Sequence, residues 1–161
     1  SSASFTFASP TRGLYGGGKN ADGVDFSSVE LINISSGGDS TQFPEIITAR
    51  EQGAGSCNQT KGVFAGGQGG PTIVNNIESI IISSLGNSVE FGNLTVSVRQ
   101  LMSAGSHTRG VFAGGKTPSS VNTISYVNIS SSGDALDFGD LTLERHAAAG
   151  FSDSHGGLGG F

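Results

Sequence analysis

The amino-acid sequence predicts an all-β protein built from a repeated unit of 46–49 residues. A seven-residue phrase starts at Arg12, Lys61 and Arg109 and returns in a weaker form at His155, so its copies are 49, 48 and 46 residues apart. Gly makes up 27 of the 161 residues, while charged residues are only 13% of the chain. A chain dominated by Gly, Ser, Asn and Thr disfavours helices and suits short strands joined by tight turns. A fixed period of this length is typical of arrays whose units stack on one another.

Each unit is expected to begin with two strands. The first is a segment of small residues just before the phrase, at residues 4–9, 53–58, 103–107 and 147–153. The second is the phrase itself, a short apolar run that glycines stop, at residues 13–16, 62–65 and 110–113. This pattern is typical of a buried inner strand, and a double glycine permits positive φ at the exit of that strand. The glycines at this exit include Gly66, Gly67, Gly114 and Gly115.

Two further strands complete each unit. Loops that differ in length and composition follow the double glycines, at residues 19–28, 68–76 and 116–122. The third strand is rich in β-branched residues, a strand signal, and is predicted at residues 29–34, 77–82 and 124–129. The fourth strand carries an aromatic residue, which is Phe43, Phe91 or Phe138. The unit closes on an arginine, which is Arg50, Arg99 or Arg145.

Four short strands in each period match a blade of a β-propeller. The chain is therefore expected to be a single repeat array, with units at approximately 3–50, 51–99 and 100–145 and a partial fourth at 146–161. Because propellers close with about four to eight blades, this number of units does not complete a ring. Either the chain is a segment of a longer array, or copies of it pair to complete the ring. We favour the first, since the sequence stops within a repeat.

The repeat is similar to the kelch motif of β-propellers. The residues that carry the likeness are Val63–Gly67, Val111–Gly115, Tyr126, Phe91, Phe138 and the closing arginines Arg50, Arg99 and Arg145. Here Phe stands where kelch blades have Trp. A closer resemblance is to repeats of bacteriophage structural and tail-fibre proteins, especially those of marine phages, and it rests on residues 91–95 and 138–142. This resemblance implies a virion appendage or surface protein concerned with host attachment.

The predicted function is that of a non-enzymatic phage virion protein, a tail fibre or appendage, whose loops recognise a host-surface receptor. The loops after the double glycines are the candidates for contact, because the repeats differ most there. Polar side chains suited to glycan hydroxyls in these loops are Asn20, Asp22, Asp25, Gln68, Lys116 and Ser119. The alternatives are a purely structural virion subunit that docks other tail or capsid proteins, and a secreted propeller lectin or hydrolase. The expected partners are other virion proteins, further copies of the chain or a host-cell glycan.

Charge and hydropathy argue against two classes of partner. The net charge is −5 and Lys and Arg form no cluster, so a surface that tracks phosphates is disfavoured. The longest apolar run is far shorter than the roughly 18 residues that indicate a membrane span. Cys57 is the only cysteine, which leaves no disulfide framework and predicts a small buried thiol.

No cofactor or metal is expected from the sequence. Copper chemistry of the galactose-oxidase kind, known on kelch-type propellers, would need a Cys–Tyr pair and two His ligands, whereas here His107 and His155 fall at turns. Residues 20–25 resemble part of a calcium loop, with Glu30 as the nearest downstream acid, but they are interpreted as a loop of Asx turns. The closing arginines are predicted to satisfy carbonyl groups of the adjacent repeat. A ring of cations that faces an acidic ligand is the alternative.

Overall fold

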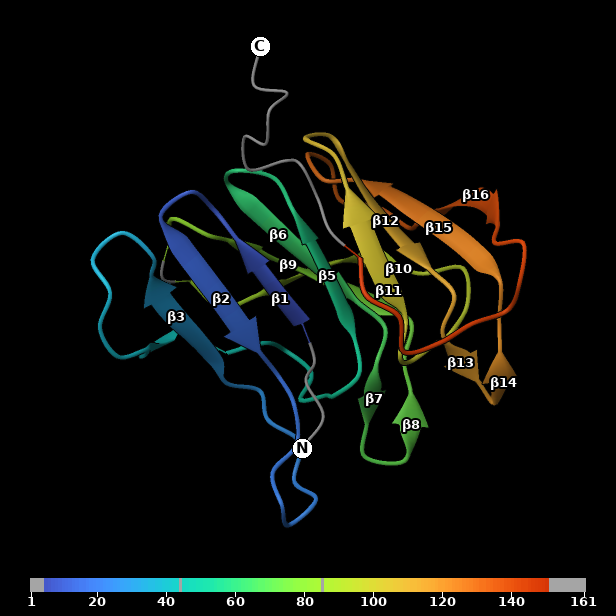
Figure 1. The fold of residues 1–161 in the computed structure, drawn as a ribbon, viewed down its shortest axis with the longest axis horizontal. Helices are drawn as coiled ribbons and strands as arrows, with labels where there is room; N and C mark the ends of the chain where they lie inside the picture. The colour runs from blue at the N-terminus through green and yellow to red at the C-terminus, as the bar shows by residue number, and fades with distance from the viewer. Residues whose placement is uncertain (1–4, 44, 85, 151–161) are drawn as a thin grey trace.

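The computed structural model describes residues 5–43, 45–84 and 86–150. Within these ranges the chain forms antiparallel β-sheets and no helix, so the all-β prediction is confirmed. Three sheets have four strands each, and two short hairpins lie along one edge of the molecule (Figure 1). No helix of the described residues is long and apolar enough to cross a membrane.

The three large sheets follow one another along the chain. Sheet 1 consists of β1 (Phe5–Ala8), β2 (Arg12–Gly16), β3 (Val29–Asn33) and β4 (Thr41–Phe43). Sheet 2 consists of β5 (Ala54–Cys57), β6 (Lys61–Ala65), β9 (Asn76–Ile81) and β10 (Val89–Asn93). Sheet 3 consists of β11 (Met102–Gly105), β12 (Arg109–Ala113), β15 (Thr123–Asn128) and β16 (Leu136–Asp140). In each sheet the strands pair in chain order.

The strands lie where the sequence predicts them, with two differences. The loops after the second and third double glycines contain hairpins, β7–β8 (Gln68–Gly69 and Thr72–Ile73) and β13–β14 (Lys116–Thr117 and Ser119–Ser120). The strand predicted at 147–153 is not formed by residues 147–150, and the rest of it lies outside the described residues. The phrase at 155–161, with His155, also lies outside them.

Strand register makes the three sheets equivalent residue by residue. Phe5 pairs with Gly16 at the start of sheet 1, Ala54 with Ala65 in sheet 2, and Met102 with Ala113 in sheet 3. The double glycines then leave the second strand with the same left-handed geometry, since φ is 63° and 105° at Gly66–Gly67 and 62° and 106° at Gly114–Gly115. Such angles favour glycine. The predicted role of the double glycines is confirmed.

Consecutive sheets contact each other through their first strands, β1, β5 and β11 (Figure 1). Small residues permit this approach. A Cβ atom on Gly62 of β6 would overlap the buried ring of Phe7 in β1. Polar contacts accompany the packing, because the Ser103 hydroxyl of β11 donates to the carbonyl oxygen of Gly55 in β5 at 2.6 Å.

The apolar core consists of two clusters, one at each junction between sheets. The cluster between sheets 1 and 2 contains Phe5, Phe7, Leu14, Val29, Phe43, Ile46, Cys57, Phe64, Ile80 and Ile82. The ring of Phe5 stacks on that of Phe64 with centroids 4.1 Å apart, which ties β1 to β6. The thiol of Cys57 is buried in this cluster, as predicted, and donates to the carbonyl oxygen of Ala8 at 3.2 Å. The second cluster joins sheets 2 and 3 and includes Phe91, Leu94, Val98 and Phe112.

The junction geometry predicts a contrast between two equivalent glycines. Gly62→Ala is expected to lower the free energy of unfolding by about 1–3 kcal/mol, because its methyl group overlaps Phe7. Gly13→Ala, at the same position of sheet 1, meets only ordinary contacts with Tyr15 and Ile34 and is expected to stay within about 0.5 kcal/mol of the parent. Urea unfolding of the two variants measures the difference. Equal losses would contradict close packing at Gly62.

Candidate functional site

The loops that follow the double glycines gather along one edge of the molecule. In Figure 1 the loop between β2 and β3, the β7–β8 hairpin and the β13–β14 hairpin all extend from the same side. The first loop has no hairpin, but Lys19 and Asp25 form an isolated antiparallel pair within it. The repeated scaffold therefore presents three different loops side by side.

Three of the predicted contact residues hold these loops together. Asn20 Oδ1 accepts from the backbone amide of Val24 at 2.9 Å, which closes a turn. Asp25 Oδ2 accepts from the amide of Gly70 at 2.6 Å, so the first loop is tied to the tip of the β7–β8 hairpin. Gln68 donates from Nε2 to the Gly70 carbonyl at 2.8 Å. These three polar groups therefore form hydrogen bonds within the chain itself.

The other three predicted contact residues differ in accessibility. Asp22 is exposed in the first loop, and Ser119 is exposed in β14, directly after the tip of the β13–β14 hairpin. Lys116 is half-buried, and its backbone forms two hydrogen bonds with Arg99, at 2.8 and 3.3 Å. Asp22 and Ser119 are therefore the best placed of the six to meet a molecule in solution.

The residues suggested for metal binding do not converge. Within the described part of the chain no group of three or more His, Cys, Asp or Glu side chains could hold an ion. In the calcium-like loop, Lys19 Nζ lies 3.5 Å from Asp25 Oδ1, so a cation already faces this carboxylate. His107 is exposed, and His146 Nδ1 lies 2.8 Å from the Ser120 hydroxyl. His155 lies outside the described residues.

A second set of contacts ties the end of one repeat to the loop of the next. Glu51 and Gln68 exchange two backbone hydrogen bonds, at 2.9 and 2.8 Å, and Arg99 and Lys116 do the same. Glu51 also accepts from Lys19 Nζ at 2.9 Å. This hydrogen bond, followed by the charges of Glu51 and Asp25, raises the pKa of Lys19 above its ordinary value despite opposing desolvation.

Arg50 occupies a buried socket at the junction of sheets 1 and 2. Its side chain is 1% exposed, and Nη1 donates to the carbonyl oxygens of Gly66 and Asn76 at 3.1 Å each. Its Nη2 pairs with Oε1 of the fully buried Glu78, and its guanidinium lies 5.2 Å from the ring centroid of Phe64. Burial lowers the pKa of Arg50, and the charge of Glu78 opposes this shift. The prediction that a closing arginine satisfies carbonyls of the adjacent repeat is confirmed here.

The three closing arginines do not share one position, which corrects the prediction for Arg99. The carbonyl oxygens of Arg50, Val98 and Arg145 each accept a 2.8 Å hydrogen bond from the second glycine of their own sheet. Val98 therefore takes the place of Arg50 in sheet 2. Arg99 takes the place of Glu51 and pairs with Gln68 Oε1. One extra residue causes the shift, because Arg99 follows Phe91 by eight residues, whereas Arg50 follows Phe43 by seven.

The third closing arginine and the aromatic before it are uncovered. Arg145 is exposed, with a 3.5 Å contact from Nε to the carbonyl oxygen of Leu143. Phe138 is 53% exposed, whereas its counterparts Phe43 and Phe91 are 1% and 4% exposed between sheets. The ring of Phe138 lies edge-on to the ring of Tyr126, with the ring centroids 5.6 Å apart. The face of sheet 3 that points away from sheet 2 is its outer face. It lacks the cover that the corresponding faces of sheets 1 and 2 receive from the next sheet.

Sequence comparison adds no family assignment: no family model matches the chain, and no curated protein matches it significantly.

The Arg50 socket yields a test of stability. Arg50→Val leaves the Glu78 carboxylate buried without its cation and is expected to lower the free energy of unfolding by about 3–5 kcal/mol. The double variant Arg50→Val/Glu78→Ser recreates the Val98–Ser125 combination of the next junction and is expected to lose less. Arg99→Val, whose partner Gln68 is neutral, is the matched control with an expected loss of about 1 kcal/mol. A double variant less stable than Arg50→Val would contradict this account.

Proposed function

We propose that the three sheets are consecutive blades of a β-propeller and that the chain is a non-enzymatic recognition module. Its scaffold presents the loops after the double glycines to a host-surface receptor. The observation that carries the proposal is the gathering of three unequal loops on one edge of an otherwise repeated structure (Figure 1).

The sheet topology supports the propeller arrangement. Each sheet is a four-stranded antiparallel meander, and the first strand of each contacts that of the next. Apolar clusters fill the two junctions between sheets. Radially repeated four-stranded sheets that pack through their faces are the plan of a propeller.

The loop chemistry favours a polar ligand. The edge presents the Asp22 carboxylate and the Ser119 hydroxyl, which are groups that bind sugar hydroxyls by hydrogen bonds. The internal bonds of Asn20, Asp25 and Gln68 hold the loops in place beforehand, and such preorganisation reduces the entropy lost on binding. A glycan of a host-cell surface is the ligand class that we propose. The setting on a phage appendage, or alternatively in a secreted protein, rests on the resemblance of residues 91–95 and 138–142 to phage repeats.

A second candidate is a structural subunit of the virion that docks other tail or capsid proteins. The uncovered aromatic residues favour it, since Phe138 on sheet 3 and Tyr15 on sheet 1 are about half exposed. Exposed apolar patches of this kind mark protein interfaces. The two functions are compatible, because the exposed Asp22 and Ser119 belong to the loop edge, whereas Tyr15 and Phe138 lie on the strands β2 and β16.

Glycan binding at the loop edge is tested with an array of bacterial surface oligosaccharides. Asp22→Ala combined with Ser119→Ala is expected to weaken binding by about tenfold or more, since two hydrogen-bonding groups are lost, while the melting temperature stays unchanged. Asp39→Ala, an exposed carboxylate near the opposite end of β3, is the control and is expected to bind as the parent does. Equal binding by both variants, or no binding by the parent, would reject the proposal.

A further inference from the structure

A hollow of about 370 Å³ opens on the uncovered face of sheet 1. Its lining includes Tyr15, Gly17, Ser28 and Glu30. Tyr15 and Glu30 are paired across β2 and β3, and both are exposed. Phe5 and Phe26 line it as well, so the hollow combines aromatic rings, two backbone segments and one carboxylate.

Each of these four residues corresponds to one that binds Arg50 in sheet 2. Tyr15 pairs with Glu30 in the same register as Phe64 with Glu78. The amide of Gly17 donates to Ser28 at 3.1 Å, as the amide of Gly66 donates to Asn76 at 3.2 Å. The ring, the two carbonyl positions and the carboxylate that hold Arg50 thus have counterparts around the hollow, which is an arginine socket without its arginine.

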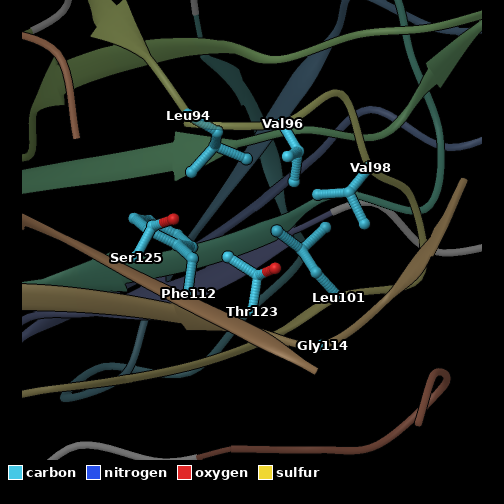
Figure 2. A pocket seen from close by; sticks show the side chains of 8 residues that line it. All are labelled: Leu94, Val96, Val98, Leu101, Phe112, Gly114, Thr123 and Ser125. Carbon is cyan, nitrogen blue, oxygen red and sulfur yellow. The ribbon is translucent and has the colours of Figure 1, made fainter. Parts of the chain in front are cut away.

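The third copy of this socket shows which feature selects the cation. At the junction of sheets 2 and 3 the corresponding residues are Phe112, Gly114, Thr123 and Ser125. Figure 2 shows Leu94, Val96 and Val98 facing Phe112, Thr123 and Ser125 across a remaining cavity of about 10 Å³. Where Val98 fills the socket the carboxylate is replaced by a hydroxyl, and where Arg50 fills it Glu78 is present. Because sheet 1 has the carboxylate of Glu30 at this position, its socket is suited to a guanidinium group.

Arg145 has the backbone position of a socket-filling residue. Its amide donates to Val121 at 3.3 Å, as the amide of Arg50 does to Phe26 and that of Val98 to Val74. Its side chain is exposed on the outer face of sheet 3. The chain thus carries one empty socket at the first sheet and one unplaced arginine at the third.

We propose that Arg145 of one copy of the chain inserts into the socket of Tyr15, Gly17, Ser28 and Glu30 in a second copy, so that sheet 3 packs against sheet 1 head to tail. The contact repeats the Arg50–Glu78 junction between two molecules. It also covers apolar surface that is exposed in the single chain. Tyr15 is 48% exposed, whereas Phe64 at the same position is 1% exposed. Residues 147–150 are exposed and form no strand, but Ala147 donates to the carbonyl oxygen of Gln100 at 2.9 Å and Gly150 lies against Ser103 of β11. They must leave this place to β1 of the second copy.

This association is tested by sedimentation velocity of the 161-residue chain over a range from micromolar to millimolar concentration. The parent is expected to form oligomers. Glu30→Arg and Arg145→Glu each place like charges at the contact and are expected to weaken self-association by at least about 100-fold. Glu90→Arg, at an exposed acid on β10, changes the net charge as Glu30→Arg does; it is the matched control for that variant and is expected to associate as the parent does.

Restored complementarity distinguishes the socket from a general effect of charge. In an equimolar mixture of the Glu30→Arg and Arg145→Glu chains, every contact between unlike chains pairs opposite charges. The mixture is therefore expected to associate again, as is the double variant. A monomeric parent, unaltered association of either single variant, or no recovery in the mixture would each overturn the proposal. Unchanged melting temperatures of the variants exclude misfolding as the cause. The result is independent of glycan binding at the loop edge.

Discussion

The structure depends on the contact between one sheet and the next. A single four-stranded sheet here has no core of its own, because its apolar side chains belong to clusters shared with a neighbour. Two features make the contact close. Small residues at positions such as Gly55 and Gly62 let adjacent strands approach, and a side chain from the end of one sheet enters a socket on the face of the next. Every other feature of the molecule is built on this repeated junction.

The two described junctions solve the same packing problem with different chemistry. Arg50 and Glu78 form a buried pair whose charges compensate each other. Surrounding carbonyl oxygens accept from Arg50 Nη1, and the amide of Ile47 donates to Glu78. Val98 and Ser125 fill the equivalent space without charge. A buried ion pair adds little net stability compared with apolar packing, but it penalises any partner that lacks the opposite charge. Charge at a socket can therefore decide which sheet follows which.

The loops and the junctions have different roles: the junctions hold the sheets together, and the loops form an exposed edge. The junctions repeat apolar clusters at equivalent places, whereas the loops after the double glycines differ in length, sequence and hairpin content. Several polar loop residues form hydrogen bonds within the protein: Asn20 and Gln68 within their own loops, and Asp25 with Gly70 of the next loop. A fixed edge with a few exposed groups, such as Asp22 and Ser119, is suited to recognition because little motion is lost on binding.

The sequence by itself determined the strand order within each repeat, because periodic β-branched residues and double glycines act over only a few residues. It also indicated that a closing arginine reaches into the adjacent repeat, as Arg50 does. The tertiary structure alone decided that Val98 and not Arg99 is equivalent to Arg50, since one added residue changes which side chain points at the neighbouring sheet. It alone brought Tyr15, Gly17, Ser28 and Glu30 around one hollow, because the hollow depends on the register of β2 with β3 and on the course of the loop between them.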